Sequence, residues 1–518
     1  MTGRHLVPLL SLLAIAGLTA SEGSLDLAQA VEHGDRDTAR MLLRRHVDVN
    51  KPEADGTTAL HWAVQADDLE LITDLVRAGA NVKATNRYGV QPITLAATNG
   101  SVNAVGALLK AGADPNTVTS GGEPVLMTAA RAGNVDTLNL LIGRGANVNA
   151  HEKWFGETAL MWAAAENHGD AVRALVAAGA DKNARSTVLD PPVLEFPRSG
   201  GPNSPFPRGG WTPLMFAARQ GAIDAARALA DLGADLDATA LPQTDVTLTP
   251  ADLTAAAHGV GTTAMVYAII NAHYELATML LEKGADPSIS DIAGMAALYA
   301  AVDMNSMQWV QGRPAPILRD RLDAVDLVRF LLEWGADPNA QLKSHPLKRH
   351  HDAGTTLNFG QGATPLLRAA RTNDVAVMTL LLDYGADPFL MLPDRTDALL
   401  IAAGVGYQGL RGEGIRIVVP TEQAAIDAIT LLLNQGMDIR AFNAAGNTAI
   451  HGAVHRGDSV VRFLAAHGAP VNQKNRAGYT PVDVALGKGG RGNVPDVRES
   501  TAALLRTLIQ DDKGSTRN

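Results

Sequence analysis

The sequence predicts an all-α solenoid of about twelve helix–turn–helix repeats, with finger loops between repeats and several long loop insertions. Three observations support this fold class. A start residue, glycine in all but one case, recurs along the chain, and seven of the eleven steps between starts are 32 to 34 residues. An apolar side chain stands four residues after every start, and an alanine stands seven residues after every start. An internal period of this size is the signature of stacked repeats.

These three positions define the predicted array. The repeats start near Gly23, Gly56, Gly89, Gly122, Gly156, Gly210, Gly261, Gly294, Gly362, Arg395, Gly446 and Gly478. The alanines are Ala30, Ala63, Ala96, Ala129, Ala163, Ala217, Ala268, Ala301, Ala369, Ala402, Ala453 and Ala485. The apolar residues are Leu27, Leu60, Ile93, Leu126, Leu160, Leu214, Met265, Leu298, Leu366, Leu399, Ile450 and Val482.

Residues 89–121 show how one repeat is built. Where Thr-Pro is present, as at Thr364-Pro365, Thr is placed to cap the first helix, and Pro takes the first helical position, where no N–H is needed. That helix ends near a glycine such as Gly100, which can adopt the left-handed conformation. A second helix follows with apolar residues at helical spacing and then a turn: Val105, Leu108, Leu109 and Gly112.

The alanine has a packing reason, because a small side chain lets neighbouring helices approach closely. The apolar position three residues earlier lies on the same helix face. Neither helix of a repeat buries that face alone, so the repeats are predicted to stack on one another.

The motifs resemble those of the ankyrin-repeat family. The family pattern G-x-T-P-L-H-x-A-A is matched by GTTALHWAV from Gly56 and by GATPLLRAA from Gly362. The later G-A-D/N motif recurs at Gly79, Gly112, Gly145, Gly179, Gly233, Gly284, Gly335 and Gly385. The resemblance covers residues 23 to 511. It implies a scaffold that binds another protein through its concave face and finger loops, without catalysis or cofactor.

The histidine of the family motif is present at His61 and His451. In the family this histidine ties the loop to the next repeat. Most junctions of this chain are therefore expected to be held by other contacts.

The ends of the chain differ from the array. Arg4 and His5 precede the apolar run from Leu6 to Leu18, and small residues follow. This pattern predicts a signal peptide over residues 1–20, cleavage after Ala20, and a periplasmic or secreted protein. The alternative is an uncleaved anchor, but the run is shorter than the ~20 residues that span a bilayer. The array is then expected over residues 21–511, with a flexible tail at 512–518.

Composition excludes several classes of function. The formal net charge is −10 with both signs interspersed, and aromatic residues make up 4% of the chain. Both values argue against a nucleic-acid partner, which would need a basic stripe or stacking platforms. The chain has no cysteine, which excludes disulfides, thiolate metal sites and cysteine nucleophiles. A monomer built as one continuous array is expected.

Long insertions interrupt the regular pattern. Repeats eight and ten carry extra residues between their two helices, and the finger loops after repeats five, six and eight are lengthened. Such loops are usually functional or disordered. The loop from Arg185 to Gly209 is rich in proline and contains Phe196 and Phe206. It is interpreted either as a partner-binding finger or as a loop that braces its own solenoid.

The finger loop of repeat eight contains three histidines and an aspartate within His345 to Asp352. A metal-binding or enzymatic role is one alternative. The spacing matches no zinc pattern, so no metal site is predicted, and Lys348 and Arg349 are assigned to contact with an acidic partner. A secreted effector acting in another cell is a further alternative.

Trp62, Trp162 and Phe216 each follow the apolar position of a first helix by two residues. They are interpreted either as lining the concave surface or as packing between repeats. No nucleophile motif or phosphate-binding glycine loop is found, so no catalytic residue is predicted. The predicted partner-binding residues are Phe196, Phe206, Trp162, Phe216, Lys348 and Arg349.

Overall fold

The computed structural model describes residues 26–188, 209–240, 260–306, 318–344, 360–406, 420–488 and 497–515. Over these residues it contains helices, turns and isolated β-bridges, so the all-α expectation is confirmed. The described residues within Met1–Thr187, Thr212–Ala217 and Asp224–Ala234 form one compact unit, here called unit 1. Those within Val188–Trp211, Ala218–Ile223 and Asp235–Asn518 form the second, unit 2.

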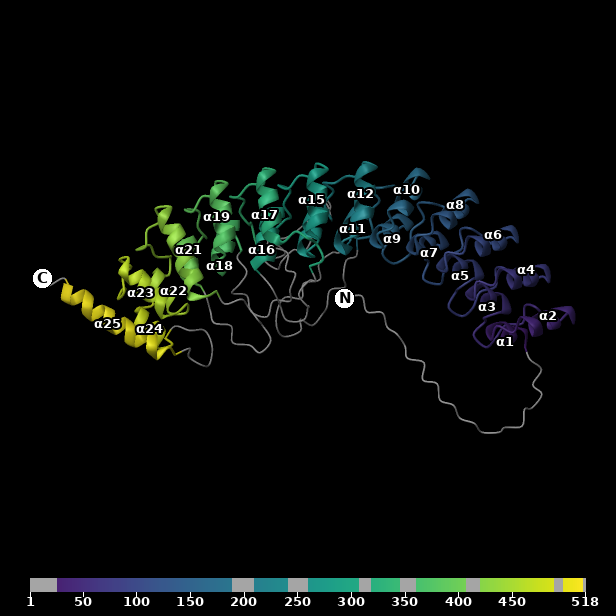
Figure 1. The fold of residues 1–518 in the computed structure, drawn as a ribbon, viewed down its shortest axis with the longest axis horizontal. Helices are drawn as coiled ribbons and strands as arrows, with labels where there is room; N and C mark the ends of the chain where they lie inside the picture. Colours follow the sequence, from purple (N-terminus) through teal and green to yellow (C-terminus); the bar gives the residue numbers. More distant parts are fainter. Residues whose placement is uncertain are drawn as a thin grey trace, which may run out of the picture. The chain divides into compact units, whose positions relative to one another are not determined.

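Unit 1 is built from paired short helices, drawn from purple to blue in Figure 1. The pairs are α1 (Leu27–Glu32) and α2 (Arg36–Arg44), α3 (Ala59–Gln65) and α4 (Leu69–Arg77), α5 (Pro92–Thr98) and α6 (Val102–Lys110), α7 (Val125–Ala132) and α8 (Val135–Gly143), and α9 (Ala159–Ala165) and α10 (Gly169–Ala177). The helices α11 (Pro213–Gln220) and α12 (Ile223–Asp231) contribute residues to both units.

Unit 2 repeats the arrangement. Its helices are α14 (Ala264–Ile270), α15 (Tyr274–Glu282), α16 (Ala297–Ser306), α17 (Ala324–Glu333), α18 (Pro365–Thr372), α19 (Val375–Asp383), α20 (Ala398–Ala402), α21 (Glu422–Asn434), α22 (Ala449–Ala453), α23 (Asp458–Ala466), α24 (Pro481–Ala485) and α25 (Glu499–Ser515). The last helix continues past residue 511, where the sequence pattern of the array ended.

Within each unit, first helices pack on first helices and second helices on second helices. The helix α3 lies between α1 and α5, and α4 lies between α2 and α6. The same alternation relates α16 to α14 and α18 in unit 2. Each repeat therefore buries its apolar face against the next, as the periodicity predicts.

The recurring alanines form the centre of this packing. All twelve have no exposed surface. The apolar position four residues after each start is also buried, except at Val482, which is half-buried. Val482 lies on α24, and no first helix follows α24 in the described chain to cover it.

The predicted helix ends are confirmed. The Thr364 hydroxyl accepts a hydrogen bond from the Leu367 N–H at 3.2 Å, with Pro365 at the first helical position. Gly133 ends α7 with a φ of 73°, in the left-handed region. These caps satisfy backbone groups that would otherwise lack partners at the helix ends.

Two kinds of side chain join successive repeats. His61 lies with Nε2 3.1 Å from the Val90 carbonyl oxygen, and His451 makes the equivalent contact with Tyr479. At several junctions without this histidine, an asparagine after the second helix reaches the next repeat. Asn116 donates to the Gly145 carbonyl at 3.0 Å and accepts from the Asn147 N–H at 2.8 Å.

Candidate partner-binding surface

Aromatic side chains on the first helices of unit 1 form one row along the stack. They occupy the position two residues after the buried apolar residue, and successive repeats carry Trp62, Leu95, Thr128, Trp162 and Phe216 there. All except Thr128 are half-buried, so each side chain packs against its own repeat and also presents surface to solvent. The assignment of Trp162 and Phe216 to partner binding stays a prediction.

Polar groups flank this row. The Trp62 indole N–H donates to the Glu53 carboxylate at 2.9 Å. The Arg131 guanidinium lies 5.0 Å from the Trp162 ring centroid, within the range of a cation–π contact. The buried Trp162 indole nitrogen has no hydrogen-bond partner in the described structure. The row thus offers apolar area and one exposed cation.

The remaining predicted contact residues lie outside the described residues. Phe196 and Phe206, Lys348 and Arg349, and the histidine-rich stretch from His345 to Asp352 all fall in the gaps between described ranges. Among the residues that the structure describes, no three His, Asp or Glu side chains come together in a way that could hold a metal ion.

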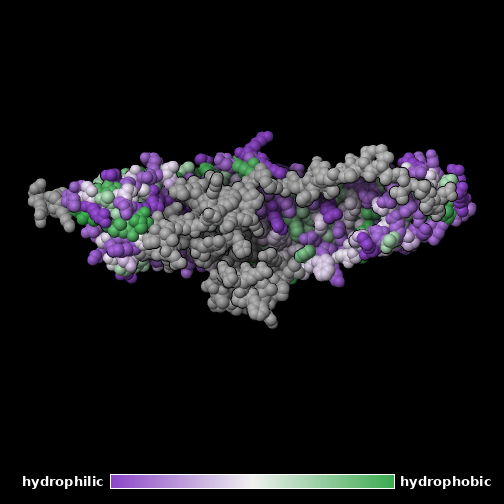
Figure 2. Space-filling view, turned by 90° about the horizontal axis from the view of Figure 1, so that it is seen from below, coloured by the Kyte–Doolittle hydropathy of each residue, from purple (hydrophilic) through white to green (hydrophobic). Residues whose placement is uncertain are grey.

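Sequence reasoning missed a second aromatic feature, at the tips of the finger loops in unit 1. Trp154 is 62% exposed, Phe155 is 53% exposed and Tyr88 is 55% exposed. The step from Gly122 to Gly156 is 34 residues rather than 33, and the extra residue falls in the loop that carries Trp154 and Phe155. This irregular step is the sequence feature that could have drawn attention to the loop. On the face drawn in Figure 2, hydrophobic residues occupy separate small areas among hydrophilic ones.

Unit 2 instead buries ionisable groups, both on its first helices and in the loop before α16. The Arg368 guanidinium is 2% exposed, and its Nε lies 2.5 Å from Oδ1 of Asp303 on the neighbouring first helix. Burial raises the pKa of the Asp291 carboxyl to about 7, against stabilising hydrogen bonds from the Met295 and Ala293 N–H groups. Burial also raises the pKa of Tyr299. These groups lie inside the packing of unit 2, and the ion pair between Arg368 and Asp303 joins two of its repeats.

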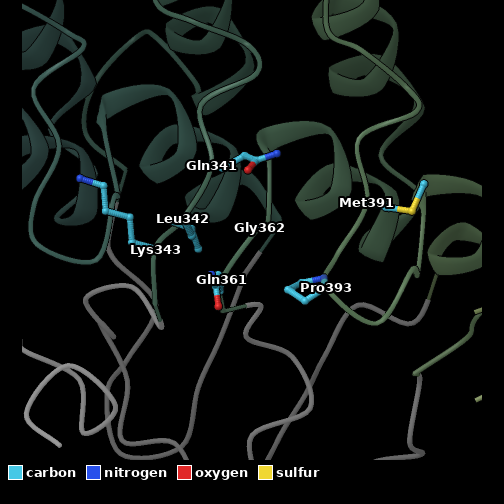
Figure 3. A pocket seen from close by; sticks show the side chains of 7 residues that line it. All are labelled: Gln341, Leu342, Lys343, Gln361, Gly362, Met391 and Pro393. Carbon is cyan, nitrogen blue, oxygen red and sulfur yellow. The ribbon is translucent and has the colours of Figure 1, made fainter. Parts of the chain in front are cut away.

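A shallow groove of about 480 Å³ lies between connecting loops of unit 2 (Figure 3). Its lining residues come from loops, not helices: Gln341, Leu342, Lys343, Gln361, Gly362, Met391 and Pro393. Lys343 is the only ionisable residue among them. The groove therefore has no acid–base or nucleophilic pair, and it offers amide, thioether and aliphatic contacts.

The stacked helix pairs and the finger loops between them define a helical-repeat solenoid. Family models of ankyrin repeats match the chain at residues 27–119, 108–186, 126–240, 202–291, 361–391 and 445–476. The matched ranges include more than half of the sequence. The chain belongs to the ankyrin-repeat family.

Part of this sequence is similar to that of curated proteins. "Palmitoyltransferase AKR1" of Lachancea kluyveri is 28% identical over 188 residues, which are 36% of this chain. The match spans 21% of the length of that protein. The chain thus resembles about a fifth of this relative. No helix in the described ranges is long and apolar enough to cross a membrane.

Proposed function

We propose that this protein is a non-catalytic scaffold that binds another protein through the first-helix faces and finger loops of its repeats. The observation that carries the proposal is the row through Trp62, Trp162 and Phe216, which leaves aromatic surface half-exposed on a rigid stack. Exposed aromatic side chains on a preformed surface are typical of protein-binding sites, since their contact area costs little conformational entropy.

The proposal includes the elongated fingers after repeats five, six and eight. Their sequences place Phe196, Phe206, Lys348 and Arg349 in loops that are longer than the ordinary connection. Aromatic anchors supply buried area on binding, and rim cations accelerate association with an acidic partner. The same loops are the place where the metal-binding alternative would act, because they contain His345 to Asp352.

A catalytic role similar to that named for the yeast relative finds no support in these residues. The sequence has no cysteine, so no thiol can act as a nucleophile. The perturbed carboxyl of Asp291 is buried in a repeat junction rather than placed in a cleft with a partner base. We further propose that the protein is exported, to the periplasm or the medium, because of the pattern from Arg4 to Ala20.

Differential affinity capture tests the scaffold proposal. The mature chain is used as bait on the envelope fraction of its own cells, beside a Trp162→Ser/Phe216→Ser variant and a variant with the three long fingers trimmed to the ordinary connection. The variants should retain their helical circular dichroism and lose the partner captured by the wild type. A partner retained equally by all three baits would place binding elsewhere, and metal found in the purified protein by elemental analysis would favour the metal-binding alternative.

A further inference from the structure

The finger loop between repeats four and five displays two aromatic side chains in a fixed geometry. Trp154 and Phe155 are both more than half exposed. Large apolar side chains that stand together in water cost free energy and mark interaction sites. The preceding repeats of unit 1 stack with finger loops that are one residue shorter, so stacking by itself does not require this longer tip.

A buried carboxylate holds this loop. Glu152 is 7% exposed, and its carboxylate accepts hydrogen bonds from three backbone N–H groups in the tip: Trp154 at 2.5 Å, Phe155 at 2.5 Å and Glu157 at 3.2 Å. The Phe155 carbonyl in turn accepts from the Thr187 N–H at 2.6 Å. These bonds satisfy the Glu152 carboxylate within the loop and fix the conformation of the tip before binding. A preorganised tip loses less conformational entropy when a partner docks.

The neighbouring fingers of unit 1 continue the same edge. A side chain at Gly122, whose φ is +79°, would place its Cβ 2.9 Å from the Lys153 Cβ, so the two loops approach as closely as glycine permits. One loop further back, the Ser120 hydroxyl donates to the Tyr88 carbonyl at 2.7 Å. Tyr88 and the pair Trp154–Phe155 therefore belong to one continuous row of loop tips.

Cations accompany each aromatic group in this row. The Lys153 ammonium lies 5.4 Å from the Trp154 ring centroid, and the Arg87 guanidinium lies 4.7 Å from the Tyr88 ring centroid. Within the described residues, neither cation forms an ion pair with a carboxylate. The Arg87 charge contributes to the lowered pKa of the nearby Asp55 carboxyl. The row is thus basic and aromatic on a chain whose net charge is −10.

We propose that this finger row, defined as Arg87, Tyr88, Lys153, Trp154 and Phe155, recognises an acidic polypeptide segment that carries an apolar or aromatic anchor. The anchor packs on Trp154 and Phe155, and carboxylates of the segment pair with Lys153 and Arg87. The inference rests on the proposed protein-binding function and names the chemistry of the partner. A lipid surface is disfavoured because two cations supply only about 2 kcal/mol of attraction to an anionic membrane, and the acidic chain opposes it.

A random twelve-residue peptide display library, selected on the immobilised mature chain, tests the proposal. Enriched peptides should carry more Asp and Glu than Lys and Arg, together with an aromatic or large aliphatic residue. Their binding should fall at least tenfold with Trp154→Ser/Phe155→Ser. It should also fall with Lys153→Glu, and rising salt should weaken wild-type binding more than binding by the Lys153→Glu variant. Phe442→Ser is the matched control, since Phe442 is an exposed aromatic residue on a loop of unit 2, and it should leave binding unchanged.

Three results would overturn the proposal, and they differ in what else they affect. Enriched peptides that lose binding with Trp162→Ser/Phe216→Ser but not with Trp154→Ser/Phe155→Ser would leave the protein-binding function in place and move its site to the first helices. Enriched peptides without an acidic excess would reject the charge assignment. Binding to vesicles of one part phosphatidylserine and three parts phosphatidylcholine, lost with Trp154→Ser, would assign the row to a lipid surface.

Discussion

The Asn443 side-chain amide donates a hydrogen bond to the Thr396 hydroxyl, 3.1 Å away, and joins the finger loop before repeat eleven to the start of repeat ten. Asp291 and Thr262 occupy the same two positions three junctions earlier, between repeats seven and eight. A carboxylate has no N–H to donate. One oxygen of Asp291, Oδ2, is buried without a hydrogen-bond partner, and burial raises the pKa of its carboxyl to about 7.

Asp291→Asn is expected to stabilise the protein at alkaline pH. An unfolded aspartate has a pKa near 3.9, so between about pH 4 and pH 7 the folded chain holds a proton that the unfolded chain releases. The free energy of unfolding therefore falls as pH rises through this window, and the whole penalty is present above it. The variant should exceed the wild type by on the order of 1–3 kcal/mol at pH 8, and the difference should be smallest near pH 4, as measured by thermal unfolding.

The control for this change is Asp55→Asn. The Asp55 carboxyl accepts the Thr57 N–H at 2.9 Å, and this bond lowers its pKa. That variant should gain no stability at pH 8. Equal gains from both substitutions would show that the effect comes from net charge rather than from burial.

His61→Ala is expected to loosen the junction between repeats two and three. His61 Nδ1 accepts the Thr58 N–H at 3.1 Å, while Nε2 faces the Val90 carbonyl. Burial lowers the pKa of His61, so its contribution is present above about pH 6.5, the unfolded value, and is lost as pH falls through the folded pKa. The variant should lose about 1–3 kcal/mol at pH 8, and the difference should shrink toward pH 5. The exposed His33→Ala should show neither effect.

Asp303→Ala is expected to destabilise unit 2 by about 3–5 kcal/mol, because it leaves the buried Arg368 guanidinium without its carboxylate. Adding Arg368→Met should recover a large part of this loss, since the uncompensated charge is then removed. A double-mutant cycle in denaturant unfolding measures the coupling. Losses that simply add would show that the two groups do not depend on one another.

Ala369→Leu is expected to overpack the contact of α18 with α16 and α20, at a cost of about 1–3 kcal/mol. Hydrogen exchange should rise first in the adjoining repeats, because coupling in a solenoid is between nearest neighbours. Ala466→Leu, at an exposed helix end, is the control. Uniform loosening along unit 2 would contradict nearest-neighbour coupling, and unchanged melting would remove the packing explanation for the recurring alanine.

Export predicts that the mature protein begins between about residues 20 and 24, because repeat one already starts at Gly23. N-terminal sequencing of the protein from its native cells checks this. Soluble cytoplasmic protein that retains Met1 would reject export.

The sequence by itself determined the repeat. Start residue, apolar position and alanine recur along the chain, and the twelve alanines are all fully buried. It also identified His61 and His451 as junction residues. These features follow from local rules, because helix caps, glycine turns and helical spacing act within one repeat. For Trp162 and Phe216 it left two interpretations open, the concave surface and packing between repeats.

Only the tertiary structure decided which side chains meet across repeats. The pairing of Arg368 with Asp303 joins residues 65 positions apart, and the burial of Asp291 depends on loops from its neighbours. Trp154 and Phe155 gave no periodic signal, and their exposure follows from the hydrogen bonds that Glu152 makes to the loop tip. The period of a solenoid can be recognised from the sequence of each repeat. Burial, charge pairing and exposed recognition elements depend on contacts between repeats, and sequence spacing alone does not give those contacts.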